Sequence, residues 1–503
     1  MVPRIELDHS SETPLYRQLY EQLRSAILAN RMVRGERLPA TRELAWSLGL
    51  NRQTVGSAYD LLEAEKLIKA YVGRGSFVEG AETARLDWES LIPADDNSPA
   101  PASASAAISF SASRPPEDAF PLEAFRETCR EVIDSSEAVN ILQLGPASGY
   151  GPLRRYLLDE SRERGFARED DDILMTSGCQ QGFDLIQRVL ASHGETVILE
   201  DPVYPGLRNV FQRGGARVIG APVGEEGVEV ETLGRLIEKE HPRLMVLTPN
   251  FQNPTGTTIP EAARREIVEL ARRNGVVIVE NDLYGALRYS GTDLPSFKRL
   301  DVSGDSIQLG SFSKIAFPGL RVGWAIGPRH FIARLTEAKE ASDLHSDQLS
   351  QAVLLRFAES GRLADHHVKT LASGAERLKE CLAGCARELP QGSRYTRPEG
   401  GMNVWVRLPE MLDASELAAR AARKCQLSSG PLFCGDAPAD ARAAAEFCGL
   451  ETRADSRRNA RARIDFQEGV GAEAGVPGRT GAGGGLKKRQ FKNEGPRSFH
   501  VSI

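Results

Sequence analysis

Apolar residues near the amino terminus recur at the spacing of an amphipathic helix. Leucine or isoleucine occupies positions 15, 19, 23 and 27, which predicts a helix with one buried face. A second helix is expected over Thr41–Leu48, followed by the suitable C-cap residue Gly49, and a third after the N-cap residue Asn51. Alternating residues over Leu67–Val72, a Gly-Arg-Gly turn and the segment Ser76–Val78 then predict a two-stranded ribbon. Three helices followed by a ribbon are typical of a winged helix-turn-helix domain.

A different pattern begins after Phe110, where short apolar runs alternate with helical segments. The runs are Asp172–Thr176, Thr196–Leu199, Leu244–Leu247, Val276–Val279 and Ile307–Leu309. Such strands, separated by helices, predict an α/β domain with a mostly parallel sheet covered on both faces. Each run leads directly into a polar cluster. In sheets of this kind ligands bind at the carboxyl ends of the strands, so we expect a binding site there.

Composition divides the chain of 503 residues into four parts. We expect the winged helix over residues 11–79 and the α/β domain over residues 110–440. Residues 80–109 between them are rich in proline, alanine and serine, which is typical of a flexible linker. Residues 441–503 become glycine-rich and contain no amphipathic helix, so we expect this segment to be disordered.

Charge and cysteine content narrow the class of protein. The net charge of −6 argues against a protein that coats nucleic acid, but it is compatible with one small DNA-binding module. No apolar run approaches the roughly 18 residues of a membrane span, and the first residues lack the apolar core of a signal peptide. We therefore expect a cytoplasmic protein. The seven cysteines show no disulfide framework, and Cys381 and Cys385 are expected to be buried thiols rather than metal ligands.

The third helix of a winged helix enters the major groove of DNA with its amino-terminal residues first. Here those residues include Arg52, which is suited to guanine, Gln53, which is suited to adenine, and Thr54. Arg42 and Arg74 are suited to phosphate or minor-groove contacts. Residues 1–80 hold 11 Lys+Arg and 10 Asp+Glu, so charge alone does not indicate DNA, and a small dimerisation module is the alternative.

Lys314 is the centre of the candidate chemistry. A lysine that forms a Schiff base must lose its proton, so it needs a site that lowers its pKa. Ser311, Ser313 and Arg321 supply the hydroxyls and the fixed cation that an adjacent phosphate requires. We therefore interpret Lys314 as a lysine that binds pyridoxal phosphate. The alternative is a surface lysine in a serine-rich loop.

Other strand ends supply the remaining groups that this cofactor needs. Asp282 is placed to keep the pyridine nitrogen protonated, and Asn253 and Tyr284 are donors for the 3′-oxygen. Tyr204 is suited to stacking on the ring. Backbone N–H groups at a helix start bind phosphate, and the segment Ser177–Gln180 opens a helix after a strand. Each group alone has an ordinary structural interpretation, and only their combination predicts the cofactor.

The amino-terminal motifs resemble those of the GntR-type winged helix. They are Pro14–Gln18, Leu38–Ala45, Asn51–Val55 and Gly73–Val78. The resemblance implies that Arg42, Arg52, Thr54 and the wing tip near Gly75 contact operator DNA.

Residues 110–435 are similar to fold-type-I aminotransferases. The resemblance implies that Lys314 is the Schiff-base lysine, Asp282 the pyridinium partner, Asn253 and Tyr284 the ligands of O3′, and Tyr204 the ring stacker. The implied phosphate ligands are Gly178, Cys179, Gln180, Ser311, Ser313 and Arg321. A GntR-type domain fused to such a domain resembles the MocR family of transcriptional regulators. That resemblance implies a domain-swapped homodimer that senses a small amino compound.

The sequence departs from this family in two places. Leu144 stands where family members have a tyrosine that reaches the partner subunit's cofactor phosphate. Beyond about Asp440 the resemblance fades, and the expected carboxylate-binding arginine has only a distant counterpart in Arg463–Phe466. A shifted reading frame near residues 440–450 is one hypothesis, which the other frames of the encoding DNA would test.

Three functions remain open from the sequence. The leading one is a regulator that combines DNA binding with a cofactor-dependent sensor. The second is a working aminotransferase that carries a DNA-binding module. The third is a DNA-binding protein whose large domain has lost its cofactor and serves only in dimerisation.

Overall fold

The computed structural model describes residues 5–11, 13–29, 31–79, 119–409 and 412 in full. It also describes the backbone of short strands at 108–109, 425–426, 428–429, 443–446 and 498–502. The chain separates into two compact units, residues 1–102 and 103–503. Among the described residues, no helix is long and apolar enough to cross a membrane.

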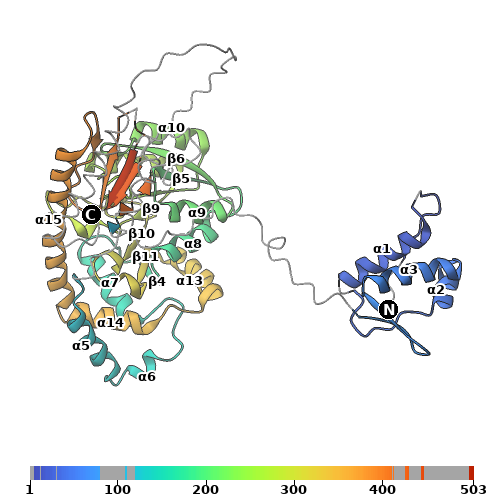
Figure 1. Ribbon diagram of the computed structural model, residues 1–503. Coiled ribbons are helices and arrows are strands. Elements are labelled where there is room, and N and C mark those ends of the chain that lie inside the picture. The colour runs from blue at the N-terminus through green and yellow to red at the C-terminus, as the bar shows by residue number, and fades with distance from the viewer. Residues whose placement is uncertain are drawn as a thin grey trace, which may run out of the picture. The chain divides into compact units, whose positions relative to one another are not determined.

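The amino-terminal unit consists of three helices and a ribbon, as the sequence predicts (Figure 1). The elements are α1 (Leu15–Leu28), α2 (Thr41–Leu48), α3 (Arg52–Ala64), β1 (Ile68–Tyr71) and β2 (Gly75–Val78). Both predicted helix caps are confirmed. Gly49 is left-handed at φ 65°, and the Asn51 side chain accepts a hydrogen bond from the backbone N–H of Gln53 at 2.9 Å.

This unit has an apolar core of its own. Leu19, Leu23 and Ile27 of α1 pack with Val55 and Leu62 of α3, and all of them are buried. A complete core within about 70 residues is typical of a domain that folds independently.

The second unit is built on an eight-stranded sheet in the order β4-β11-β10-β9-β8-β5-β6-β7. The strands are β4 (Asp171–Thr176), β11 (Gly323–Pro328), β10 (Ile307–Ser311), β9 (Val277–Asn281), β8 (Leu244–Leu247), β5 (Thr196–Asp201), β6 (Arg217–Gly224) and β7 (Gly227–Val228). The pairs β10–β9, β9–β8, β8–β5 and β5–β6 are parallel, and the remaining pairs are antiparallel. The predicted mostly parallel sheet is therefore confirmed.

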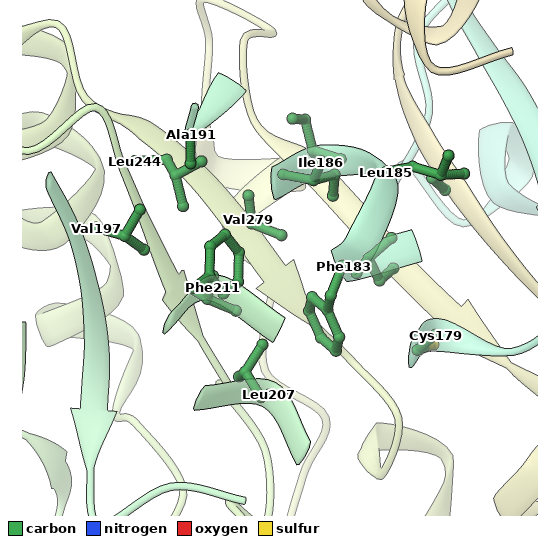
Figure 2. Close-up of a cluster of buried hydrophobic side chains, with 14 of the residues drawn as sticks. Cys179, Phe183, Leu185, Ile186, Ala191, Val197, Leu207, Phe211, Leu244 and Val279 are labelled. Atoms are coloured by element: carbon green, nitrogen blue, oxygen red, sulfur yellow. The ribbon is translucent and has the colours of Figure 1, made fainter. Parts of the chain in front are cut away.

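Helices cover both faces of the sheet, and residues that alternate along each strand explain why. Val197 and Val279 point toward α8 and α9 with Phe183 and Phe211, as Figure 2 shows, and Leu199 belongs to the same buried cluster. Their neighbours Ile198, Met245 and Ile278 pack on the opposite face against α10 and α11. The helices are α5 (Leu122–Ile133), α6 (Ala138–Ile141), α7 (Gly151–Glu163), α8 (Cys179–Leu190), α9 (Pro205–Arg213), α10 (Val230–Glu240), α11 (Glu261–Asn274), α12 (Phe297–Leu300), α13 (Arg329–Asp343), α14 (Gln348–Glu359) and α15 (Arg362–Glu388).

Three strands continue further than their apolar runs predict. β5 continues to Asp201, β9 to Asn281 and β10 to Ser311. Because the backbone pairing persists, the carboxyl groups of Glu200 and Glu280 are buried inside the sheet instead of starting a polar loop.

After the residues of the eight-stranded sheet, the chain forms a smaller layer from one long helix and two short strands. The long helix α15 packs through Leu378, Cys381 and Cys385 against Val404 and Val406 of β13 (Asn403–Arg407), and β12 (Arg394–Tyr395) pairs with β13. The two cysteines are buried free thiols, as expected.

Short strands pair beyond this layer. β3 (Ile108–Ser109) pairs with β14 (Cys425–Gln426), and β13 pairs with β17 (Ser498–Ser502), which also contacts β15 (Ser428–Ser429) and β16 (Ala443–Glu446). The expectation of disorder after residue 440 thus does not hold for β16 and β17. The other residues of that segment, including Arg463–Phe466, lie outside the described residues, as does the linker up to residue 107.

Candidate cofactor site and DNA-reading surface

Lys314 lies at the carboxyl end of β10, in a short 3-10 helix over Phe312–Lys314. Ser311 caps this helix, because its hydroxyl accepts a hydrogen bond from the backbone N–H of Ser313 at 3.0 Å. The Ser311 hydroxyl also lies 2.9 Å from that of Ser313. Lys314 Nζ stands 5.6 Å from the centroid of the Tyr284 ring. The structure thus brings the lysine and the residues after β9 to one edge of the sheet.

The predicted phosphate ligands converge beside this lysine. Gly178 precedes the first residue of α8 with φ 81°, a conformation that glycine adopts without strain. A Cβ atom at Gly178 would stand 2.3 Å from Nη2 of Arg321, so bare backbone and a guanidinium share this corner. The helix start and the cation together suit an anion.

Cys179 and Gln180 are the first residues of α8, so their backbone N–H groups lie at the helix start next to Gly178. Burial raises the pKa of the Cys179 thiol to about 12, although the charges of Arg321 and Lys314 act in the opposite direction. The Gln180 side chain donates to the Gly206 carbonyl at 2.9 Å, which ties α8 to α9. The fully buried thiol and the engaged amide leave the backbone N–H groups as the donors that suit a phosphate.

Asn253 and Tyr284 meet as the sequence predicts. Asn253 Nδ2 donates to the Tyr284 hydroxyl at 3.0 Å. Asn253 Oδ1 is buried and has no hydrogen-bond partner among the described residues. Buried polar atoms are rarely left without a partner, so this amide suits a ligand atom.

Asp282 follows β9 and is anchored through its backbone N–H to the Leu309 carbonyl at 3.1 Å. Its Oδ1 accepts a hydrogen bond from Asn250 Nδ2 at 3.2 Å. Burial raises the pKa of Asp282, whereas the Asn250 hydrogen bond and the charge of Arg264 act to lower it. Tyr204 caps α9 and is 48% exposed, so its ring is accessible to a ligand.

This arrangement fits pyridoxal phosphate. The corner at Gly178 and Arg321 suits the phosphate, the Asn253–Tyr284 pair suits the phenolic oxygen, and Asp282 suits the ring nitrogen. The fold and these residues define a pyridoxal-phosphate-dependent protein of fold type I. When bound, the cofactor supplies an electron sink for bonds to the carbon of an attached amine.

Sequence reasoning missed three residues that support Asp282. They are Asn250, which holds its carboxylate, Arg264, which holds Asn250, and Gly285, on which both side chains pack. One signal was present, because an arginine at position 264 lies on the apolar face of α11 with Ile267, Val268 and Ala271.

The amino-terminal unit presents the predicted DNA-reading residues on its surface. Arg52 and Gln53 open α3 and are exposed, as are Arg42 and Arg74, while Thr54 is half-buried. Gly75 begins β2 with φ 101°. Arg37 was not predicted. It is exposed and its side chain lies against Gly75, where an added Cβ would stand 3.1 Å from Nε.

The recognition helix α3 is braced from α1. Arg24 Nε lies 2.8 Å from Glu65 Oε2, and the Tyr20 hydroxyl donates to the other oxygen of the same carboxylate. Because Glu65 is the C-cap of α3, these contacts orient the helix that carries Arg52.

Comparison with known protein families agrees with both units. Residues 107–429 match the family described as aminotransferase class I and II. Residues 15–78 match the family described as bacterial regulatory proteins, gntR family.

Individual relatives match either the second unit alone or both units. Aromatic-amino-acid aminotransferase 1 of Thermococcus litoralis is 36% identical over 63% of this chain and 77% of its own length. The probable rhizopine catabolism regulatory protein MocR of Rhizobium meliloti is 29% identical over 85% of this chain and 88% of its own length. A solved structure of LysN, an alpha-aminoadipate aminotransferase from Thermus thermophilus complexed with N-(5′-phosphopyridoxyl)-L-leucine, is 31% identical. It superposes with a TM-score of 0.67 over 73% of this chain and 93% of its own.

The chain therefore belongs to the class I and II aminotransferase family, with a GntR-type DNA-binding domain at its amino terminus. This combination makes it a pyridoxal-phosphate-dependent transcriptional regulator of the MocR type.

Proposed function

We propose that an amino compound binds at the cofactor beside Lys314 and thereby changes the affinity of the amino-terminal unit for operator DNA. One observation carries this proposal. The same chain holds a DNA-reading unit with its own core and a second unit whose strand ends gather Lys314, Asp282, Asn253 and Tyr284. A ligand shifts such an equilibrium by its differential affinity for two states of the protein, typically about 1–3 kcal/mol of coupling.

Each cofactor residue has a separate role in this proposal. Lys314 forms the Schiff base, and Asp282 holds the proton on the ring nitrogen. Asn253 and Tyr284 donate to the phenolic oxygen, and Tyr204 stacks on the ring. The phosphate is bound by backbone groups at Gly178–Gln180 and by the side chains of Ser311, Ser313 and Arg321.

The amino-terminal unit makes two kinds of contact with DNA in this proposal. Arg52, Gln53 and Thr54 at the start of α3 read base edges in the major groove. Arg42, Arg74 and the wing tip near Gly75 contact the sugar–phosphate backbone or the minor groove. Operator DNA as the partner implies a cytoplasmic protein.

A second copy of the chain is the protein partner in this proposal. Large apolar side chains are 46–81% exposed on α5, on α6 and in the segment that follows: Leu122, Ile133, Val139, Leu142 and Leu144. Several large apolar side chains exposed along one stretch of chain are a feature of interaction surfaces. Leu144 is one of them and occupies the position where the family's tyrosine reaches the partner.

The decisive experiment follows cofactor and DNA in one sample. Operator duplexes are selected by the purified protein from a random library, and candidate amines are then titrated while the visible spectrum and DNA anisotropy are recorded. We expect the effective amine to change the spectrum and the DNA affinity at the same concentration. In Lys314→Ala, the same amine should leave DNA affinity unchanged. A spectral change without any change in DNA affinity would contradict the proposal.

An active aminotransferase is the second candidate. It is favoured by the cofactor residues that gather at the strand ends and by the 36% identity to an aromatic-amino-acid aminotransferase over the second unit. Its test is keto-acid formation with amino-acid substrates. Steady turnover above roughly 1 per second, the low end for ordinary enzymes, with operator affinity unchanged, would favour this candidate over the sensor.

A further inference from the structure

Arg264 is a buried cation that forms no ion pair with any carboxylate among the described residues. It belongs to α11 and is fully buried, and its guanidinium donates four hydrogen bonds. The acceptors are the carbonyls of Ile259, Pro295 and Pro249, at 2.7, 2.9 and 2.8 Å, and Oδ1 of Asn250 at 2.7 Å. A buried charge is costly unless it is well bonded. These four hydrogen bonds compensate the burial of the guanidinium, and they fix its position next to Asn250.

The hydrogen bond from Arg264 determines which way the Asn250 amide faces. Because Oδ1 points at a guanidinium, Nδ2 points the other way and donates to Oδ1 of Asp282 at 3.2 Å. A reversed amide would set an NH₂ group against the cation and an oxygen against the carboxylate, and both contacts would be repulsive. Asn250 is thus held as a permanent donor to Asp282.

The residue next to the side chains of Asn250 and Asp282 is Gly285, which has no Cβ atom. A Cβ atom at Gly285 would stand 2.3 Å from Oδ1 of Asp282 and 3.0 Å from Nδ2 of Asn250. The carboxylate and the amide therefore rest directly on the 3-10 turn Gly285–Leu287, which leaves little room for either to rotate.

Burial favours the neutral form of Asp282 and raises its pKa, and four features oppose it. The hydrogen bond from Asn250 and the positive charge of Arg264 are the two largest that lower the pKa of this carboxyl, and the charge of Arg164 and the backbone hydrogen bond from Gly285 act in the same direction. The nearby Glu280 does not compete for Asn250, because it accepts hydrogen bonds from the backbone N–H groups of Phe297 and Lys298.

We propose that Arg264 and Asn250 are positioning residues, which hold Asp282 ionised and oriented so that it retains a proton on the ring nitrogen of pyridoxal phosphate. The relay runs from the cation to the amide oxygen, and from the amide N–H to the carboxylate. It rests on the assignment of Asp282 to the ring nitrogen. Removing the donor at Asn250 weakens binding only of a cofactor that has this nitrogen.

The test compares two cofactors on the apoprotein. Pyridoxal phosphate and its 1-deaza analogue, in which a C–H replaces the ring nitrogen, are each titrated into wild type and Asn250→Asp. One pKa unit corresponds to a tenfold change in equilibrium. We expect pyridoxal phosphate to bind the variant about tenfold more weakly, with the affinity for the deaza analogue unchanged within about twofold. Equal losses for the two compounds, or no loss for either, would overturn the relay.

Four further variants keep the result interpretable. The quantity compared is the affinity for pyridoxal phosphate divided by the affinity for the deaza analogue. Asn250→Leu and Arg264→Met should lower this ratio, whereas Arg265→Met, which changes the exposed neighbour on α11, should leave it unchanged. The ratio corrects for general loss of structure, so either Asn250 variant is sufficient if the other does not fold. Asp282→Asn tests the underlying assignment. If it lowers the ratio and the Asn250 variants do not, only the relay fails, and if it has no effect, both assignments fail.

Discussion

Gly178→Ala tests the phosphate corner with one methyl group. The added Cβ would stand 2.3 Å from Arg321 Nη2, whereas ordinary contact begins at 3.4 Å. The guanidinium must therefore move by roughly 1 Å. Its remaining contacts are long, at 3.5 Å to Ser313 Oγ, 3.4 Å to the Pro318 carbonyl and 3.5 Å to the Ser177 carbonyl, so they do not resist this movement.

Two separate costs follow from this substitution. Alanine at φ 81° is strained by about 1–3 kcal/mol, which lowers the stability of the folded apoprotein. With Arg321 in its proposed role, the displaced guanidinium would lose a charge-assisted hydrogen bond to the phosphate, worth about 1.5–3 kcal/mol. Since about 1.4 kcal/mol is a factor of ten, pyridoxal phosphate should bind about 10- to 100-fold more weakly.

Gly275→Ala is the matched control. Gly275 also has a positive φ, 67°, but nothing lies within 4 Å of its added Cβ. Both variants should lose thermal stability as apoproteins, and Gly178→Ala should lose more, because Gly178 at φ 81° and ψ 168° lies in a region essentially confined to glycine, whereas Gly275 is left-handed at φ 67° and ψ 33°. Only Gly178→Ala should lose cofactor affinity in an equilibrium absorbance titration. Equal cofactor affinity in the two variants would refute the placement of Arg321 at the phosphate.

Three other predictions concern Lys314, the DNA contacts of the amino-terminal unit and the buried carboxyl group of Glu200. Lys314→Ala should abolish both the visible absorbance of the bound cofactor and its attachment by borohydride, and unchanged labelling would reject Lys314. Arg52→Ala should relax specificity by about 1–3 kcal/mol at one base pair, whereas Arg74→Ala should weaken all duplexes alike and flatten the salt dependence. Equal losses on operator and random DNA for Arg52→Ala would contradict the groove assignment. Burial raises the pKa of Glu200 from 4.5 to about 8, so the folded state retains a proton that the unfolded state releases, and stability falls as the pH rises between these values. Glu200→Gln should remove this pH dependence. The free energy of unfolding of the variant minus that of the wild type should be larger at pH 8.5 than at pH 4, by at most about 5 kcal/mol. Urea unfolding that gives the same difference between variant and wild type at both pH values would contradict this prediction.

Local sequence determined which elements form and where the amino-terminal helices begin and end. The apolar spacing of α1, the N-cap at Asn51 and the left-handed Gly49 depend on residues within a turn or two, so they could be predicted from short segments. The polar groups after each strand were also predictable, because parallel strands bring their carboxyl ends to one edge. For this reason Lys314, Asp282, Asn253 and Tyr284 could be named before their positions were known.

Only the tertiary structure decided which groups meet at each position. Asn250 contacts Asp282, and Arg264, 14 residues further along the chain, contacts Asn250, so no local period marks the three residues as a unit. Arg321 and Gly178 meet because β11 lies between β10 and β4, an order that depends on long-range pairing. Chain segments determine helices and strands through nearest-neighbour geometry, whereas the charge state of a buried carboxylate depends on every group that folding packs around it.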